Sequence, residues 1–555
     1  MTGVLASLQR LLPSRSDYAE LPRSWRADLL AGLTVGIVAL PLALGFGIAS
    51  GAGAEAGLVT AIVAGLVAAV FGGSHVQVSG PTGAMVVILA PVVSVYGVGA
   101  VALVTLMAGV MVVVAGFARL GRAVSYIPWP VIEGFTLGIA VIIFLQQVPA
   151  LTGAAGSGPH TNVVASALSS VTHADPATLA WSLATVGLVA ACMLLLPRLR
   201  PRLPGSLVGI VVATLAALVL HAPLATIGAL PSTLPAPALP ALDPETMRAL
   251  LPAALTVAAL AAIESLLSAR VAASLADTGA YDPDRELLGQ GLASLAAGLF
   301  GGMPATGAIA RTAVNVRSGA RTRASAAAHA VVLLAVVLVV AGPVAHIPLA
   351  ALSGVLMVTA VRMVHLATAR SILRSTRADA AAFLVTAVVT VSVDLIVAVG
   401  IGVIVAGAFA LRGLARATGV AREPVPGEPE AGDEQIAVVR IDGPLFFAAA
   451  DRVLDEVTGL DGVTVLVLRM SQLELVDATG AHVLSEIVQR LETRGVTVLI
   501  KGVRDGHVEL FRTVGVLDAL RHQNHLFDNL DAAVAHARDH VRRAEHPSAA
   551  DIKAA

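Results

Sequence analysis

The pattern of hydrophobic and polar residues changes sharply along the chain. Residues 28–415 are almost continuously apolar, whereas residues 416–555 have the mixed polarity of a soluble domain. Apolar runs of about 18 residues suit a bilayer core about 30 Å thick. The pattern predicts a cytoplasmic segment over 1–27, a transmembrane domain over 28–415, a linker over 416–434, a soluble domain over 435–540 and a flexible tail over 541–555.

Arginine placement indicates fourteen membrane segments. Arginine clusters alternate with loops that are almost free of Lys and Arg, such as residues 151–178 and 222–247. The positive-inside rule then places both termini in the cytoplasm, which an even number of spans requires. The sequence therefore predicts a multi-pass protein of the cell (inner) membrane, with both ends on the cytoplasmic side.

Two membrane segments are interrupted in the same way. Residues 75–85 and 301–311 each run from a short extended stretch through Pro and Gly into an apolar helix, and Thr-Gly-Ala occurs in both, at 82–84 and 306–308. This repeat predicts two halves of equal layout. With seven segments per half, the second half begins on the opposite side of the membrane, so the repeat is inverted.

Interrupted helices of this kind predict a binding site near the middle of the membrane. The first N–H groups of a helix have no intrahelical partner and carry partial positive charge, so two facing helix starts attract an anion. The alternative is that both interruptions are kinks that serve helix packing. The predicted substrate-binding residues are Pro81, Thr82, Gly83, Ala84, Thr306, Gly307, Ala308, Ile309, Ala310 and Arg311.

Glu264 and Arg311 are the charged residues of greatest interest inside the membrane. Glu264 is a lone carboxylate in an apolar helix, and such a group usually faces a cavity or a partner. We predict that it exchanges a proton, or holds Na⁺ together with Ser268 one turn later. The alternative is a buried ion pair with Arg270 or Arg311. For Arg311 the competing interpretation is membership of the cytoplasmic basic cluster.

These segments resemble the sulfate permease family, also called solute carrier family 26. The resemblance rests on residues 40–47, 79–83 and 302–312. It implies a seven-plus-seven inverted repeat with a core domain (segments one to four and eight to eleven) and a gate domain formed by the other segments. It also implies transport of sulfate, bicarbonate, chloride, oxalate or dicarboxylates, usually by a homodimer. Phe46 matches the family's pocket aromatic, and Leu42 stands where the family often has Gln.

The same resemblance implies roles for the two charged residues. Family members carry an acidic residue at the position of Glu264, where it serves ion coupling. Arg311 matches the family's basic residue near the anion.

The C-terminal region reads as a small α/β domain. Buried strands are predicted at 436–441, 464–469 and 496–502, with amphipathic helices between and after them. Its order resembles the STAS domain shared by sulfate transporters and anti-sigma factor antagonists, whose soluble relatives carry a phosphorylatable hydroxyl in one turn. Here that turn contains Asp477 and Thr479, which are weak regulatory candidates or simply the cap of the next helix.

The leading functional prediction is a secondary transporter of small anions of the sulfate or bicarbonate class, coupled to H⁺ or Na⁺. Alternatives are a dicarboxylate transporter, an uncoupled channel or exchanger, and a membrane-anchored regulatory scaffold. The sequence shows no Walker loop, metal-ligand cluster or catalytic triad, so we predict no enzyme activity, no cofactor and no bound metal beyond a possible Na⁺. A net charge of −1 gives no reason to expect nucleic acid as a partner.

Overall fold

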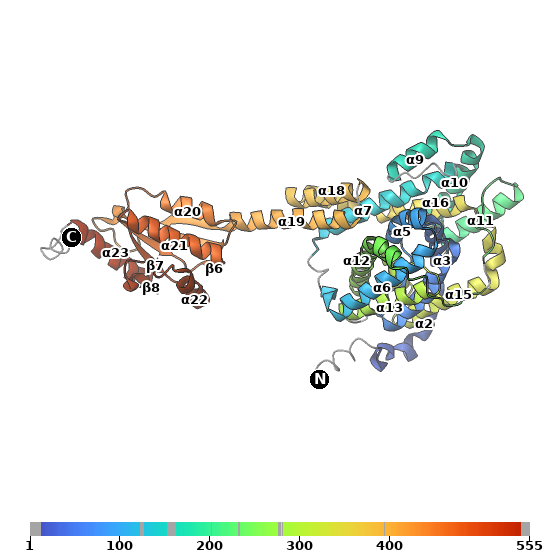
Figure 1. Cartoon of the computed structure of the whole chain (residues 1–555), viewed down its shortest axis with the longest axis horizontal. Helices are drawn as coiled ribbons and strands as arrows, with labels where there is room; N and C mark the ends of the chain where they lie inside the picture. Colours follow the sequence, from blue (N-terminus) through green and yellow to red (C-terminus); the bar gives the residue numbers. More distant parts are fainter. Residues whose placement is uncertain are drawn as a thin grey trace. The chain divides into compact units, whose positions relative to one another are not determined.

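The computed structural model describes residues 13–122, 127–152, 163–200, 203–230, 233–275, 279, 281–392 and 395–545. The chain divides into two compact units, Met1–Val403 and Ile404–Ala555. Figure 1 shows that the first unit is built of helices and that the second contains the large sheet.

The first unit begins with a 3-10 turn, η1 (Arg15–Tyr18), and contains two series of helices, each with one two-residue strand. The first series is α2 (Leu21–Ala49), α3 (Ala54–Val59), the π-helical turn η2 (Thr60–Ala64), α4 (Gly65–Phe71), β1 (Ser79–Gly80), α5 (Gly83–Tyr96), α6 (Gly99–Phe117), α7 (Trp129–Gln146), α8 (Val148–Thr152), α9 (Val163–Thr172), α10 (Pro176–Leu199) and α11 (Gly205–Val219).

The second series has the same layout, with a short strand before its third membrane segment. It consists of α12 (Pro244–Leu275), α13 (Pro283–Leu299), β2 (Thr306–Gly307), α14 (Ile309–Arg317), α15 (Ala324–Ala345), α16 (Leu349–Met363), α17 (Leu366–Arg374), α18 (Arg377–Ser392) and α19 (Leu395–Ala417), and the chain boundary between the two units falls within α19. The fold is thus the predicted seven-plus-seven inverted repeat.

Helices of the two series pack against one another rather than forming separate halves. In one bundle α6 packs on α13 and α2 packs on α15, while in the other α7 packs on α18 and α10 packs on α16. The first bundle contains both short strands, and α16 contacts α2 of the first bundle. This interleaving produces a core bundle and a gate bundle, each drawn from both repeats.

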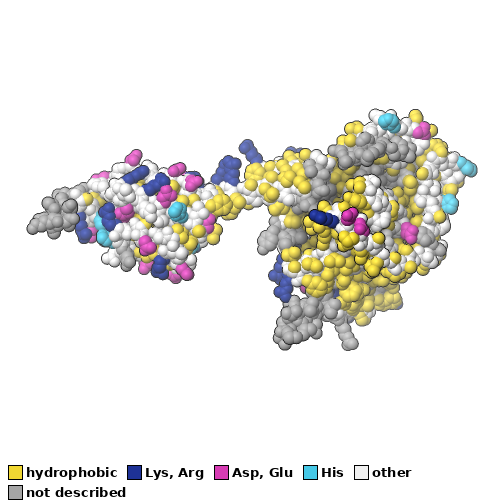
Figure 2. All heavy atoms as spheres, in the orientation of Figure 1, with side chains coloured by type: hydrophobic (Ala, Val, Ile, Leu, Met, Phe, Trp, Pro, Cys, Tyr) yellow, Lys and Arg dark blue, Asp and Glu magenta, His cyan; other side chains and the backbone are white. Residues whose placement is uncertain are grey.

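The composition of the helices suits a lipid environment. Among the residues that the structure describes, nine helices are long and apolar enough to cross a membrane. Figure 2 shows that the visible face of the first unit is largely hydrophobic, whereas charged side chains are spread over the second unit. Apolar surface on this scale is typical of a membrane protein.

The second unit is a mostly parallel sheet with helices on both faces. Its strands are β3 (Gly419–Glu423), β4 (Ile436–Leu445), β5 (Val465–Arg469), β6 (Leu473–Val476), β7 (Thr497–Lys501) and β8 (Leu526–Phe527), and its helices and turns are η4 (Asp433–Gln435), α20 (Ala450–Thr458), α21 (Ala478–Thr493), α22 (Asp505–Val514), η5 (Gln523–His525) and α23 (Leu530–Glu545). The strand order is β3-β4-β5-β7-β8, with β6 also paired to β4 and only β3 antiparallel to its neighbour.

Side chains alternate between the two faces of this sheet, as a strand requires. Val439 and Ile441 pack with α20, α21 and α22 on one face, whereas Val438 packs with Ala533 and Ala537 of α23 on the other. Each face therefore has its own hydrophobic core.

Two predicted boundaries need correction. The linker predicted over 416–434 contains β3, which hydrogen bonds along β4 and belongs to the sheet. The tail predicted to begin at 541 is helical up to Glu545 because α23 continues through it, while 546–555 lie outside the described residues.

Candidate functional site

The two interrupted segments lie side by side. Strand β1 pairs antiparallel with β2, so that Ser79 is opposite Gly307 and Gly80 is opposite Thr306. The Ala308 N–H extends the pairing by donating to the Val78 carbonyl at 2.9 Å. Because α5 and α14 follow these antiparallel strands directly, their first turns start from the same small sheet.

Neither helix start is capped by its own side chain among the described residues. The N-cap residue of α5 is Thr82 and that of α14 is Ala308, and neither accepts a side-chain hydrogen bond from the first turn. Unpaired N–H groups at a helix start are a preformed site for an anion. Ile309 is 43% exposed, so the first turn of α14 is open on one side.

Glu264 on α12 holds the side chain of Thr82 at the start of α5. The Thr82 hydroxyl donates to Oε2 of Glu264 at 2.8 Å. Among the ion pairs of the described residues, none within 4.0 Å joins Glu264 to Arg311. The carboxylate instead adjoins the start of α5.

Serines on α12 hold the second interrupted segment. The Gly307 N–H donates to Oγ of Ser265 at 3.0 Å, and the same hydroxyl lies 3.0 Å from Oγ1 of Thr306. Ser268, predicted as a sodium ligand, shares a hydrogen bond of 3.2 Å with Thr312. Ser265 therefore fixes β2, and Ser268 fixes the first turns of α14.

Arg311 supplies a buried positive charge beside the paired strands. Its side chain is 2% exposed, its Nη2 donates to the Pro81 carbonyl, and its Nη1 is buried without a hydrogen-bond partner among the described residues. A cationic nitrogen in this state is unfavourable unless an anion or carboxylate lies near it. The unpaired nitrogen is thus a feature that a bound anion would satisfy.

Glycine is required where the strands and Arg311 approach so closely. A Cβ atom at Gly80, whose φ is +154°, would lie 2.6 Å from Nη1 of Arg311. One at Gly307 would lie 1.7 Å from the Gln77 side chain. Only a residue without Cβ brings the backbone this near to its neighbours.

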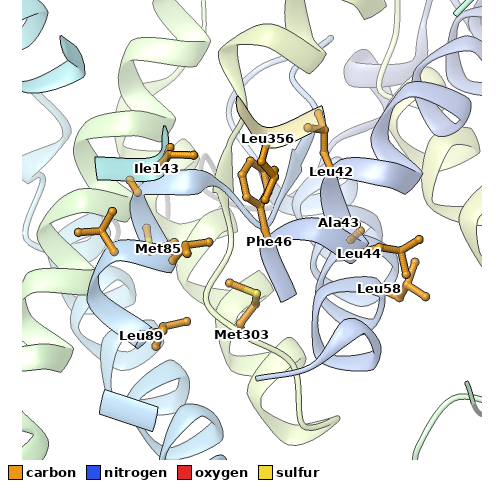
Figure 3. Close-up of a cluster of buried hydrophobic side chains, with 14 of the residues drawn as sticks. Leu42, Ala43, Leu44, Phe46, Leu58, Met85, Leu89, Ile143, Met303 and Leu356 are labelled. Atoms are coloured by element: carbon orange, nitrogen blue, oxygen red, sulfur yellow. The ribbon is translucent and has the colours of Figure 1, made fainter. Parts of the chain in front are cut away.

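An apolar wall flanks the start of α5. Figure 3 shows Phe46 of α2 in a cluster with Leu356, Met85 and Met303. The Phe46 ring is 7% exposed, and its Cε1 atom is 3.4 Å from the position of a Cβ on Gly83. The aromatic residue singled out in the sequence therefore lies over the helix start.

A buried polar network beneath the strands escaped the sequence analysis. Glu286 of α13 accepts hydrogen bonds from the backbone N–H groups of Gly73 and Ser74 and from the amides of Gln77 and Gln290. The available signal was a Glu and a Gln four residues apart on one face of an apolar helix. The network fixes the extended chain that leads into β1.

A π-helical turn adds a second support. Oγ1 of Thr60, the first residue of η2, accepts from the Met303 N–H at 2.7 Å and donates to the Ala56 carbonyl at 2.7 Å. Such turns inside α-helices often occur at functional sites because they redirect a side chain. Here the turn anchors the chain that enters β2.

The regulatory candidates of the second unit occupy the start of α21. Asp477 is the N-cap residue, and its Oδ1 accepts from the Gly480 N–H at 2.7 Å. Thr479 is exposed in the first turn. The geometry thus gives Asp477 a capping role, and phosphorylation of Thr479 stays a prediction.

The fold and the paired interruptions define a class of protein. A helical membrane protein with inverted repeats, whose discontinuous helices meet inside the bundle, has the architecture of a secondary transporter. A model of the sulfate permease family matches residues 25–386, and a STAS domain model matches residues 431–533. The chain belongs to the sulfate permease family and carries a C-terminal STAS domain.

Individual relatives agree with this assignment. YvdB of Bacillus subtilis, whose name provisionally assigns it sulfate transport, is 37% identical over 522 residues, covering 92% of this chain and 97% of that protein. The bicarbonate transporter BicA of Picosynechococcus sp. is 31% identical over 510 residues, covering 86% of this chain and 89% of that protein. Both relatives match across the membrane domain and beyond it.

Solved structures show the same fold. The transmembrane domain of a cyanobacterial BicA has a TM-score of 0.61 at 31% identity, covering 69% of this chain and 98% of that one. The murine anion transporter Slc26a9 in its inward-facing state has a TM-score of 0.83 at 18% identity, covering 96% and 95%. The second likeness concerns the fold alone.

Proposed function

We propose that this member of an anion transporter family carries a small oxyanion of the sulfate or bicarbonate class, bound between the starts of α5 and α14. The observation that carries the proposal is the buried, unpaired Nη1 of Arg311 beside two helix starts that lack side-chain caps. Backbone N–H groups would bind the oxygen atoms of the anion, and Arg311 would balance its charge. Phe46 would exclude water from one side.

In this proposal Glu264 couples anion transport to H⁺ or Na⁺. Its carboxylate accepts a hydrogen bond from Thr82, so its negative charge lies next to the residue that opens α5. That charge opposes the binding of an anion at the start of α5, and neutralising it with a proton or a sodium ion would remove the repulsion. Anion and cation would therefore favour each other's binding, which is the condition for symport.

The transport cycle would alternate access by movement of the core bundle relative to the gate bundle. Both termini would lie in the cytoplasm of the inner membrane, because the arginine clusters alternate with loops almost free of Lys and Arg. The protein would act as a homodimer, as its resemblance to the family implies.

The test is uptake of labelled sulfate or bicarbonate into proteoliposomes under an imposed H⁺ or Na⁺ gradient. We expect one gradient to drive accumulation in the wild type and Glu264→Gln to abolish that dependence. Glu133→Gln is the matched control, because Glu133 lies on α7 and, among the described residues, accepts a hydrogen bond only from the Trp129 indole. Uptake that ignores both gradients in the wild type would refute coupling.

A panel of competing anions tests substrate class in the same vesicles. Inhibition by sulfate or bicarbonate supports the proposal, whereas selective inhibition by fumarate or succinate supports a dicarboxylate transporter. Currents that rise with the anion gradient beyond the rates of alternating access indicate a channel. If the protein is folded and takes up none of these anions, the result supports the alternative of a membrane-anchored regulatory scaffold.

A further inference from the structure

A cluster of histidines in the second unit plays no part in the proposed transport. His525 belongs to η5, and His536 and His540 lie one turn apart on α23. One ring nitrogen of each lies within 4.8 Å of the corresponding nitrogen of the other two. Three imidazoles from a stretch of 16 residues, His525 to His540, are thus close together.

One distance in the cluster is that of two ligands on the same metal ion. Nε2 of His536 is 3.3 Å from Nε2 of His540. Two nitrogens bound at 2.0–2.1 Å to a tetrahedral zinc ion are separated by about 3.3 Å. All three nitrogens lie within 4.8 Å of one another, so side-chain rotation would bring the remaining nitrogens to ligand distance.

The arrangement of the rings agrees with the same geometry. The three ring centres are 4.8, 5.4 and 5.5 Å apart, with interplanar angles of 77°, 88° and 65° respectively. Three imidazoles around one tetrahedral ion have centres about 5 Å apart, because each centre lies about 1 Å beyond its bound nitrogen. Rings that are steeply inclined to one another can all direct a nitrogen at a common centre.

The ring of His525 is buried and held in one orientation, as that of a metal ligand is. It is 1% exposed, and its Nδ1 is buried without a hydrogen-bond partner among the described residues. The backbone of Val498 hydrogen bonds to the ring. A metal-bound histidine typically uses one nitrogen for the ion while a backbone carbonyl fixes the other.

We propose that the STAS domain binds one divalent transition-metal ion of the zinc class through His525, His536 and His540. All-imidazole sites suit zinc, copper and nickel rather than calcium or magnesium. The fourth position would be taken by water or by the exposed His522, whose ring centre is 5.4 Å from that of His525. This inference does not depend on the proposed anion site.

The ion would fasten the last helix to the sheet. Helix α23 packs on the sheet through Ala533, Val534, Ala537 and Val541. A metal ion shared by η5 and α23 would add a direct link at the start of β8, a strand of only two residues. Metal binding would therefore raise the stability of the domain.

The experiment uses the full-length, untagged protein in detergent, stripped of metal with a chelator and titrated with Co²⁺. We expect one equivalent to give the visible absorption of tetrahedral Co²⁺, to be displaced by Zn²⁺, and to raise the midpoint of thermal unfolding. His536→Gln and His540→Gln should each weaken binding by more than about 100-fold. His482→Gln is the matched control, because His482 is exposed on α21 outside the cluster.

Either of two results would overturn the proposal. The first is the absence of tetrahedral Co²⁺ absorption in the wild type, which would mean that the rings only pack edge to face as neutral imidazoles. The second is an absorption that survives both α23 variants, which would place the ion elsewhere. Circular dichroism checks that each variant is folded, and both substituted side chains are partly exposed, so loss of binding without loss of helicity supports the site.

Discussion

Replacing Gly80 by Ala tests whether the contact between β1 and Arg311 organises the site. The added Cβ would lie 2.6 Å from Nη1 of Arg311 and 3.4 Å from Cζ. Because non-bonded atoms normally approach to about 3.5 Å, the guanidinium would have to move by about 1 Å. That movement breaks the charged hydrogen bond to the Pro81 carbonyl, a loss of about 2 kcal/mol. The φ of +154° adds about 1 kcal/mol of backbone strain.

These terms predict a loss of about 3 kcal/mol in the free energy of unfolding, together with weaker anion binding. If about half of this free energy is lost from anion binding, the KM for anion uptake rises about tenfold. The assays are thermal unfolding of the purified protein and initial uptake rates in proteoliposomes. Gly187→Ala on α10 is the control, because nothing lies within 4 Å of its added Cβ. A Gly80→Ala protein that matches this control in both assays would refute the reasoning.

Three further substitutions test other parts of the structure. Burial acts to raise the pKa of Asp17, but the hydrogen bond from Arg285 and nearby positive charges lower it to about 2. Above pH ~4 this carboxylate therefore contributes about 2 kcal/mol to the free energy of unfolding, and the contribution is lost as the pH falls from ~4 to ~2. Asp17→Asn should remove this pH dependence of unfolding and, by leaving the buried Arg285 unpaired, cost about 3 kcal/mol. Thr60→Val should cost about 2 kcal/mol in thermal unfolding, because it leaves the buried Met303 N–H unsatisfied. Asp477→Ala should cost about 1 kcal/mol in the unfolding of the STAS domain through loss of the cap.

Each of these has a matched control. Thr136→Val on α7 removes a hydroxyl that bonds only within its own helix, to the Ile132 carbonyl at 2.9 Å. Asp461 is exposed in the turn before β5, so its replacement by Asn or Ala should change stability by less than about 0.5 kcal/mol. If a test substitution and its control change the free energy of unfolding equally, the contact assigned to the test residue is contradicted.

The architecture of the membrane unit was predictable because a bilayer restricts the choices. In a helical membrane protein the segments that face lipid must be apolar helices with an internally bonded backbone, so hydropathy and arginine placement identify most segments. The interruptions at 75–85 and 301–311 were visible for the same reason, since Pro and Gly in such segments break a strong pattern. Their pairing as β1 and β2 confirms that the two halves share a layout.

The soluble unit was harder to predict where its elements are short or polar. Strand β3 has the sequence Gly-Val-Ala-Arg-Glu, whose polar residues suit an edge strand and resemble a linker. Helix α23 is rich in Ala, His and Arg, so its narrow apolar stripe gave little signal. Strand β8, with two residues, is defined only by its partner β7.

The polar partners at the candidate site were beyond the sequence for a different reason. A pattern places Glu264 in a membrane helix, but it does not reveal that the acceptor oxygen reaches Thr82, 182 residues away in the chain. The same holds for Glu286, whose donors include backbone N–H groups of a loop more than 200 residues earlier. Side-chain contacts between distant segments depend on the final packing, and the local periodicity of the sequence does not predict them.

The two helix starts differ in a way that bears on the order of binding in the proposed cycle. The first turn of α5 is buried, with Ala84 and Met85 fully enclosed, whereas Ile309 and Ala310 at the start of α14 are exposed. An arriving anion would therefore meet α14 first and reach α5 afterwards. Because Thr82 at the start of α5 is held by Glu264, neutralising that carboxylate would act on the second step, after the anion has entered. In the proposed cycle such a site would admit the anion from one side and complete its binding only after the coupling cation has bound.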